Sequence, residues 1–424
     1  MRLAPSVRRS LRPLVLLPVL IACSQDPAGP PTPLTSLPRD LTPAELRVAG
    51  ASNAFAFDLL RRTAADRTAN SFVSPISVSM ALGMLMNGAD GATLDAMRLG
   101  LRHSAPNAPA PTLPEMNAAY RGLIDLLRGL DPTSTMRVAN GIWYREGFAA
   151  APTFLDATRT AFDAAIREVD FADGRTLGEI NGWVQEQTAG KIPTILDEIG
   201  PDDVMYLINA IYFKGAWKDA FDPRKTTPGQ FRGAEGAQQV PMMTREIRQK
   251  VLYTDRYAAT ELPYGNGAFT MTLVLPNEGQ DVHALVEEFT TARWDQMIGD
   301  LTATAATVTT DLTMPKFKVE ITRELNDDLT ALGMGDLFDA ERANLTKLAT
   351  GPERLYVGFV RHKTFVDVNE VGTEAAAVTA IGIRTTSIPV GPPPFRVDRP
   401  FLFAIRERFS GTILFLGKIV SIPG

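Results

Sequence analysis

The chain has 424 residues, of which 45% are apolar and 21% are charged, and its formal net charge is −5. This composition excludes a collagen-like, low-complexity or disordered chain and supplies enough apolar residues for a large core. The acidic balance, with no stripe of Lys and Arg, argues against a nucleic-acid-binding protein. No interior linker or internal repeat divides the sequence, so we expect one large domain.

Residues 1–22 have the pattern of a signal peptide. Arginines precede a short apolar run, 14–22, which is too short to cross a hydrocarbon core of ~30 Å. Cys23 follows and is the only cysteine, so no disulfide can form within the chain. Small residues before a cysteine resemble a bacterial lipobox, which implies cleavage before Cys23 and acylation of its thiol. The alternative is a cysteine that lies by chance beside an ordinary cleavage site.

Acyl chains on Cys23 would hold the protein on a membrane. Ser24 follows, where an Asp would suggest retention at an inner membrane, so we expect an extracytoplasmic protein, anchored at an outer membrane or in the periplasm, or secreted. Residues 23–41 are then the lipidated cysteine and a Pro-rich, semi-rigid tether. The remaining residues, 42–424, form the single domain.

Two helices can be placed in the first part of this domain. Thr42-Pro43-Ala44-Glu45 is a capping box with Pro at the first helical position. Ser74, as N-cap, and Pro75 begin a second helix, which is apolar on all sides and therefore buried. Ser77 lies inside this apolar helix and needs a hydrogen-bond partner.

Strand patterns dominate the second half of the chain. A third helix ends near Gly190, and 155–167 is a connecting stretch with a partial helical period. The apolar run 205–217 predicts a strand buried on both faces. Helices in the first half and strands in the second predict an α+β fold. The remaining expected strands are 138–144, 261–264, 269–276, 312–320, 365–368, 401–405 and 412–420.

The sequence does not point to an enzyme. His103 and His283 lie in polar stretches and are interpreted as surface residues. No nucleophile elbow, zinc-protease motif, phosphate loop or dinucleotide fingerprint is present, so we expect neither cofactor nor metal. A hydrolase on an unrelated fold would need a nucleophile–base pair that the sequence does not supply.

The segment 373–386 is unusual because nearly all its residues are small or β-branched. Read with a period of two, one face is uncharged and the other carries both charges, Glu374 and Arg384, which suits a strand with one buried face and one face in water. Glu-Ala-Ala-Ala also favours a helix, so composition alone allows an Ala-rich surface helix or a linker. The uncharged face consists of Thr373, Ala375, Ala377, Thr379, Ile381 and Ile383.

The run Asn-Glu-Val-Gly-Thr-Glu-Ala-Ala-Ala at 369–377 resembles the reactive-loop hinge of the serpins, the serine-protease-inhibitor superfamily. Further motifs follow in family order along about 380 residues, among them 70–77, 181–192 and 205–217. The resemblance implies the serpin fold, in which helices pack on a large central mixed β-sheet with further sheets. It also implies an exposed reactive-centre loop at about 370–397.

The resemblance further implies an inhibitor that acts as a suicide substrate. A serine protease cuts the loop, and the loop then inserts into the main sheet before the acyl-enzyme is hydrolysed. A non-inhibitory serpin-fold binding protein is the alternative, although small hinge residues argue against it. The implied hinge residues are Glu370, Gly372, Thr373, Glu374, Ala375, Ala376 and Ala377.

Two polar groups are also implied by the resemblance. A cluster beneath the main sheet, here called the shutter, would satisfy its members by mutual hydrogen bonds; separate backbone partners are the alternative. A second group near the top of the sheet, here called the breach, would pair Glu370 with Lys316 beside Trp217. The shutter residues are Ser74, Ser77, Asn209 and His362.

The usual serpin spacing, counted from Glu370, places the cut bond at Thr386-Ser387. Counting back from the 398–401 segment gives a position near Pro389, and Arg384-Thr385 is the runner-up. A bond after threonine implies an elastase-like or subtilisin-like serine protease as partner, ahead of a trypsin-like or cysteine protease. We expect a monomer that also contacts a membrane through its lipid anchor.

Overall fold

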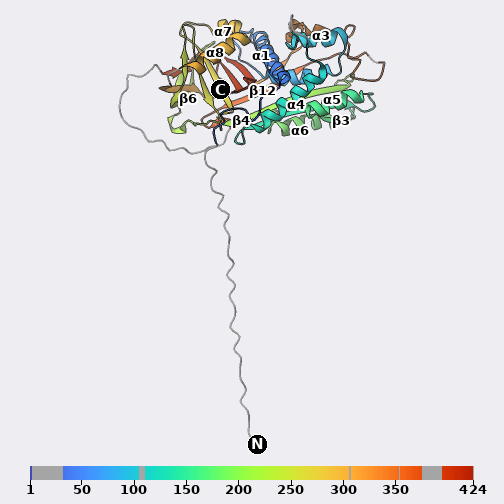
Figure 1. Cartoon of the computed structure of the whole chain (residues 1–424), viewed down its shortest axis with the longest axis horizontal. Coiled ribbons are helices and arrows are strands. Elements are labelled where there is room, and N and C mark those ends of the chain that lie inside the picture. The colour runs from blue at the N-terminus through green and yellow to red at the C-terminus, as the bar shows by residue number, and fades with distance from the viewer. Residues whose placement is uncertain (2–31, 105–109, 305–306, 353, 375–393, 424) are drawn as a thin grey trace. The chain divides into compact units, whose positions relative to one another are not determined.

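The structure is a computed structural model that describes residues 1, 32–104, 110–304, 307–352, 354–374 and 394–423 (Figure 1). It divides into two units, Met1–Thr32 and Pro33–Gly424, and all the described helices and strands belong to the second. The main helices are α1 (Pro43–Thr63), α2 (Pro75–Met86), α3 (Gly91–Gly100), α4 (Leu113–Gly129), α5 (Pro152–Phe162), α6 (Thr176–Gln187), α7 (Val282–Glu288), α8 (Thr291–Ala303) and the short α9 (Asn326–Leu329). The signal-peptide residues 2–22, Cys23 and residues 24–31 lie outside the described residues.

The domain begins earlier than the sequence predicts. Leu34 donates its N–H to the Asn266 carbonyl at 2.8 Å, and Leu34, Leu37 and Leu41 pack against the core. Arg39 pairs with Glu45 of α1 at 2.6 Å. The boundary at residue 42 is therefore too late, because apolar side chains spaced among the prolines bind the last part of the expected tether to the domain.

The strands form three sheets. The main sheet has the order β11-β12-β13-β4-β2-β3, a second sheet has the order β1-β16-β15-β9-β8-β7, and a third has the order β14-β10-β6-β5. Parallel pairs, β2 with β3 and β10 with β14, make two of the sheets mixed. The expected α+β layout is confirmed. The strand bounds are β1 Ser71–Val73, β2 Thr135–Arg145, β3 Ala165–Val169, β4 Met205–Ala216, β5 Thr227–Gly233, β6 Gly236–Gln249, β7 Val251–Tyr253, β8 Tyr257–Pro263, β9 Phe269–Pro276, β10 Val308–Pro315, β11 Phe317–Glu324, β12 Arg361–Val368, β13 Gly372–Thr373, β14 Phe395–Arg396, β15 Phe401–Glu407 and β16 Ile413–Ile419.

The helices cover the sheets in two groups. In Figure 1, α4, α5 and α6 lie together beside β3, whereas α7 and α8 lie together nearer β6. Helix α2 contacts both β4 of the main sheet and β16 of the second sheet. All its residues except Ala81 are buried, as the sequence predicts for a helix that is apolar on all sides. Helix α2 therefore packs beneath the main sheet, between it and the second sheet.

Two helix starts show how local signals act. Thr42 and Glu45 form the expected capping box, with the Thr42 hydroxyl accepting from the Glu45 N–H at 3.2 Å. Ser74 occupies the N-cap position of α2, but its side chain does not cap the helix. Its hydroxyl donates instead to the Leu414 carbonyl of β16 at 2.7 Å, so a tertiary partner replaces the local one.

Two strand predictions and the expected connecting stretch 155–167 need correction. The expected strand 312–320 is two strands, β10 in the third sheet and β11 in the main sheet, because the chain changes sheets after Pro315. In β4 only residues 210–213 form a continuous buried run, and several flanking residues are half-buried. The stretch 155–167 contains most of α5 and the start of β3.

The surface interpretation of His103 and His283 is wrong. Both are buried, at 7% and 9% exposure. His103 shares a hydrogen bond of 3.1 Å with the Tyr120 hydroxyl, and burial lowers the pKa of His103 to about 4.

Within the described residues, no helix combines the length and apolarity needed to span a bilayer.

Candidate functional site

The candidate site is a gap in the main sheet between β4 and β12. Strand β4 pairs with β2 along one edge, and β12 pairs with β11. Among the described residues, only β13 bridges the two strands, through Gly372 and Thr373. The facing edges of residues 205–214 and 361–367 therefore have no strand partner there, and we call the space between them the slot. Two unpaired strand edges that face each other can accept one further strand.

The hinge enters the slot at its upper end. Gly372 is registered with Ala216 of β4, and Thr373 is registered with both Gly215 of β4 and Val368 of β12. A Cβ at position 372 would lie 2.1 Å from the Gly215 carbonyl oxygen, so only glycine fits. The Thr373 side chain is buried, and its hydroxyl lies 2.7 Å from the Tyr264 hydroxyl. Gly372 and Thr373 of the hinge are thus already part of the sheet.

Glu374 ends this short strand. Its φ is 57°, a left-handed conformation that residues with a Cβ rarely adopt. Its carboxylate is 3% exposed, lies 3.7 Å from the Lys191 ammonium, and leaves Oε2 without a hydrogen bond. Burial raises the pKa of Glu374, although Tyr212 and Lys191 oppose this shift. The prediction that this face of the loop is in water is wrong at Glu374, because Lys191 and Tyr212 cover it.

The three breach residues meet just above the hinge. Lys316 Nζ lies 3.0 Å from Glu370 Oε2, and the Thr226 hydroxyl donates to Glu370 Oε1 at 2.8 Å. Burial opposes ionisation of Glu370, but hydrogen bonds from the backbone, Lys316 and Thr226 outweigh it and lower its pKa. The Trp217 indole N–H donates to the Asn369 carbonyl at 2.9 Å. Trp217 also stacks on Tyr264 with ring centroids 4.5 Å apart.

The four shutter residues are divided between the two sides of the slot. On the β12 side, His362 Nε2 accepts a hydrogen bond of 3.0 Å from the Ser74 N–H. On the β4 side, the Ser77 hydroxyl donates to Asn209 Oδ1. The single cluster expected from the resemblance is therefore two networks, since the described contacts join His362 neither to Asn209 nor to Ser77.

Asn140 is a further member that the sequence analysis missed. It lies opposite Asn209 in the register of β2 with β4, accepts from Asn209 Nδ2 at 2.6 Å, and donates to the Phe162 carbonyl at 2.6 Å. A single Asn inside the apolar run 138–144 was the available signal, the same signal that identified Asn209. Asn140 fixes the orientation of the Asn209 amide at the edge of the slot.

His362 is buried and neutral. Burial lowers its pKa to about 4. Because Nε2 accepts from a backbone N–H, the proton of the neutral ring is on Nδ1. Nδ1 makes no hydrogen bond in the part of the chain that the structure describes, and His362 lines the lower part of the slot.

The hinge residues Ala375, Ala376 and Ala377 and the candidate bonds Thr386-Ser387 and Arg384-Thr385 lie outside the described residues. No cluster of His, Cys, Asp and Glu suited to a metal ion occurs in the described ranges.

Comparisons with known proteins agree with this geometry. A profile of the family described as Serpin (serine protease inhibitor) matches residues 50–422. Iripin-5 of Ixodes ricinus is 35% identical over 381 residues, covering 88% of this chain and 94% of that protein. The leukocyte elastase inhibitor of Homo sapiens is 32% identical over 387 residues, covering 88% and 99%. The crystal structure of a thermophilic serpin, tengpin, in the native state has a TM-score of 0.79 at 30% identity, covering 93% of this chain and 97% of that chain.

Proposed function

Because this chain belongs to the serpin family of serine protease inhibitors, we propose that it acts on its target as a suicide substrate. It has the serpin fold, and its family is described as one of protease inhibitors, not of enzymes. The observation that carries the proposal is the slot, which already holds Gly372 and Thr373 of the hinge. Below the hydrogen bond from the Glu374 N–H to the Asp367 carbonyl, its edges have no strand partner among the described residues.

The register of the hinge predicts where the rest of the loop would lie after insertion. Gly372 pairs with Ala216 in antiparallel register, and continuing that register along β4 brings Thr379 opposite Asn209. The pairing of Thr373 with Val368, continued along β12, brings Thr379 opposite His362. Both edges therefore place Thr379 between Asn209 and His362, the residues that belong to the two separate shutter networks. The Thr379 hydroxyl would accept from His362 Nδ1 and approach the Asn209 amide, joining the two networks.

The energetics favour insertion once the loop is cut. About ten residues would gain backbone hydrogen bonds to both edges, each worth a net 0.5–1.5 kcal/mol, so the free energy falls by an amount on the order of 10 kcal/mol. Insertion would also return Glu374 to extended backbone and relieve roughly 1–2 kcal/mol of left-handed strain. The small side chains of the hinge remove steric barriers to this movement.

The chemical step belongs to the protease. Its serine attacks the carbonyl of the bond after Thr386, the peptide nitrogen leaves with a proton, and an ester to Thr386 remains. If insertion is faster than hydrolysis of this ester, the protease is carried away with the loop and its catalytic geometry is pulled apart. The stored free energy of the slot thus holds the acyl-enzyme.

We favour Thr386-Ser387 as the cut bond and an elastase-like or subtilisin-like protease as the target. A small residue before the bond suits such enzymes, and a relative is named for inhibiting leukocyte elastase. Arg384-Thr385 with a trypsin-like protease is the second candidate, and a cysteine protease ranks lower.

We also propose that the protein is a bacterial lipoprotein outside the cytoplasm. A signal peptide of residues 1–22, acylated Cys23 and a tether that now ends near residue 32 would hold a monomeric domain on the cell envelope. Metabolic labelling with a fatty-acid analogue tests this proposal, because Cys23→Ala should abolish the label.

The inhibitory function is tested by incubating the protein with elastase, subtilisin, chymotrypsin and trypsin. We expect an SDS-stable band at the combined mass of inhibitor and protease, and a released C-terminal peptide that begins at Ser387. A peptide that begins at Thr385 would move the bond to Arg384. If the loop is clipped while every protease stays active and the clipped protein melts no higher, the non-inhibitory binding function replaces the proposal.

A further inference from the structure

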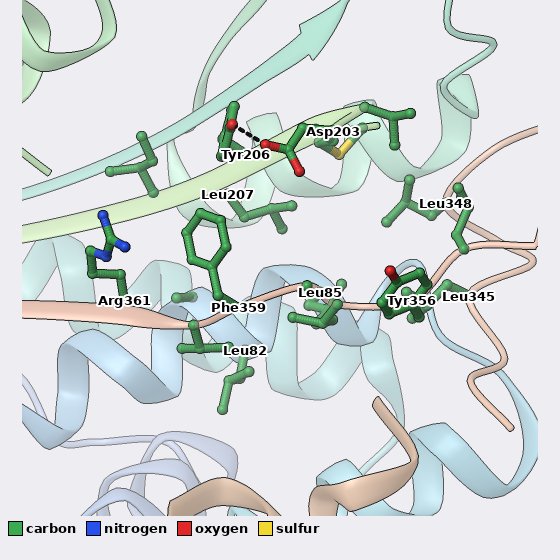
Figure 2. Close-up of a pocket in the computed structure, with 18 of the residues that line it drawn as sticks. Leu82, Leu85, Asp203, Tyr206, Leu207, Leu345, Leu348, Tyr356, Phe359 and Arg361 are labelled. Atoms are coloured by element: carbon green, nitrogen blue, oxygen red, sulfur yellow. Dashed lines mark hydrogen bonds between the residues drawn. The ribbon is translucent and has the colours of Figure 1, made fainter. Parts of the chain in front are cut away.

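The lower end of the slot widens into a cavity of about 390 Å³. Figure 2 shows its apolar lining, with Leu82 and Leu85 rising from α2 and Leu207 coming from β4. The Phe359 ring points across the cavity, and Leu345, Leu348 and Tyr356 lie at the end opposite Arg361. A cavity of this volume is within the range of small-molecule sites. Residues outside the two slot strands, among them Leu345 and Tyr356, also line the cavity. It is therefore larger than the space that one inserted strand would fill.

The charged residues at this cavity differ in how they are engaged. Arg361 pairs with Asp197 at 2.8 Å, and Arg354 pairs with Glu341 at 3.0 Å. Asp203 accepts hydrogen bonds from the Tyr206 hydroxyl and the Gly200 N–H. These charges are therefore already neutralised or hydrogen-bonded by the protein.

Arg145, at the end of β2, is the exception among the arginines. It lines the cavity and is half-buried, yet its side chain has no hydrogen bond or ion pair among the described residues. Only its backbone is engaged, with the N–H donating to the Val204 carbonyl at 2.9 Å. Asp202, a carboxylate that also lines the cavity, is exposed and forms no ion pair with it among the described residues. An unpaired, half-buried guanidinium is a strong donor for a carboxylate.

We infer that this cavity binds a small carboxylate with an apolar chain, such as a medium-chain fatty acid. The head group would lie at Arg145 and the chain over Leu82 and Leu85 of α2. At ~30 Å³ for each water-sized group, the cavity holds about a dozen non-hydrogen atoms, which matches an alkyl carboxylate of about ten carbons. The apolar walls supply most of the affinity and Arg145 supplies the selectivity for an anion.

Occupancy of this cavity would regulate the inhibitor, an inference that rests on the proposed function. Continuing the register of Gly372 with Ala216 brings Ile381 and Ile383 opposite Leu207 and Met205, which both line the cavity. A bound chain would occupy the volume that these side chains need. It would therefore delay completion of insertion and convert trapping of the protease into simple cleavage of the loop.

Binding is tested by calorimetric titration of the intact protein with decanoate and with decan-1-ol, its neutral analogue. We expect decanoate to bind at least about tenfold more tightly than the alcohol, the ratio that one charge-assisted hydrogen bond supplies. Arg145→Met should remove that preference. Arg354→Met is the matched control, because it removes a rim arginine that is already paired with Glu341 and should leave decanoate binding unchanged.

A second variant tests the body of the site. Ala81, the half-buried residue of α2, lines the cavity. Ala81→Phe should therefore fill the cavity and weaken the binding of both decanoate and decan-1-ol without deleting any core side chain. Failure of decanoate to bind, equal affinity for the alcohol, or indifference to Arg145→Met would each overturn the site.

The regulatory step is read separately, as the fraction of protease trapped with and without decanoate. We expect decanoate to lower this fraction for the native protein and to lower it less for Arg145→Met, which binds decanoate more weakly and adds no bulk that could hinder insertion. Unchanged trapping at saturating decanoate would overturn the regulation while leaving the site intact. If the native protein traps no protease at all, the proposed function fails, and calorimetry still decides the site.

Discussion

The upper and lower ends of the slot differ in how completely they are satisfied. At the upper end, Gly372 and Thr373 fill the sheet, and Lys316, Glu370 and Trp217 are bonded around them. At the lower end, the two strand edges face a cavity, and His362 and Asn209 stand in separate networks. Insertion therefore has a fixed starting point and a direction. The upper end holds the register, and the free energy still to be gained lies below it.

The largest expected effect comes from blocking entry at the upper end. Thr373→Arg would place a cation where the side chain is 2% exposed and bonded to Tyr264, so the hinge would be expelled from the sheet. We expect the variant to be cleaved by the target protease but to form less than about a hundredth of the SDS-stable complex, because a cost of about 3 kcal/mol is a factor of about a hundred. Thr373→Ser, which keeps the hydroxyl, is the control and should trap normally. Full trapping by Thr373→Arg would show that the seated hinge is not the start of insertion.

The next prediction concerns the pH dependence of stability that arises from His362, the buried histidine at the lower end of the slot. Folding lowers the pKa of His362 to about 4 from about 6.5 in the unfolded chain. The unfolded state therefore binds more protons between these values, and stability that is fully present above about pH 6.5 is lost as the pH falls towards 4. The loss approaches roughly 3 kcal/mol for His362.

His103, whose pKa is also about 4, contributes a similar pH dependence from its place beside Tyr120. Melting temperatures measured between pH 7.5 and pH 4 should show a shallower decline for His362→Gln than for the native protein. His103→Gln should flatten the curve comparably in the intact protein. If His362→Gln declines as steeply as the native protein, the ring is not buried neutral.

The next prediction concerns Thr379, whose substitution should change the stability of the cleaved protein and leave that of the uncleaved protein unchanged. Thr379→Val removes the hydroxyl that would join the divided shutter, leaving a donor of His362 unsatisfied after insertion at a cost of about 1–3 kcal/mol. We expect a lower melting temperature for the cleaved variant and no change for the uncleaved one. Thr385→Val serves as a control beyond the inserted strand. An equal change in both forms would contradict the proposed register.

Glu374 at the upper end should respond to pH in the opposite sense to His362. Its pKa is raised by burial, so the seated hinge is most stable with the carboxyl protonated and weakens as the pH rises through that pKa. Glu374→Gln should therefore slow amide exchange at Thr373 and Glu374 by a few-fold at neutral pH. Near pH 4 the variant and the native protein should converge. Faster exchange in the variant would show that the ion pair with Lys191 outweighs the cost of burial.

The smallest effect is expected at the Lys316–Glu370 pair. The Lys316 side chain is 40% exposed, and such pairs contribute about 0.2–1 kcal/mol. Lys316→Met should lower the melting temperature by no more than a few degrees, and a larger loss in Glu370→Gln would reflect the additional bond from Thr226. A large loss in Lys316→Met would assign the breach a greater role than its exposure allows.

The sequence predicted the features that local chemistry controls. The capping box at Thr42, the apolar helix after Pro75 and the last two strands, 401–405 and 412–420, follow from local patterns, and the hinge motif marked the residues that enter the slot. Features that depend on distant partners were missed. The sequence around Pro315 did not predict that the expected strand 312–320 would be two strands. The polar neighbours of His103 led to the wrong prediction that it is exposed. The cover that Lys191 provides over Glu374 arises only in three dimensions.

Hydrogen–deuterium exchange shows whether a strand enters the slot when the uncleaved protein is compared with the same protein clipped in its loop. The slot edges, residues 205–214 and 361–367, lack a shared strand partner among the described residues. If the loop inserts in the register set by Gly372, amides along these edges should become strongly protected after cleavage, down to the level of Asn209 and His362 and beyond. Unchanged exchange in both segments would contradict the account, because no strand would then have entered the slot.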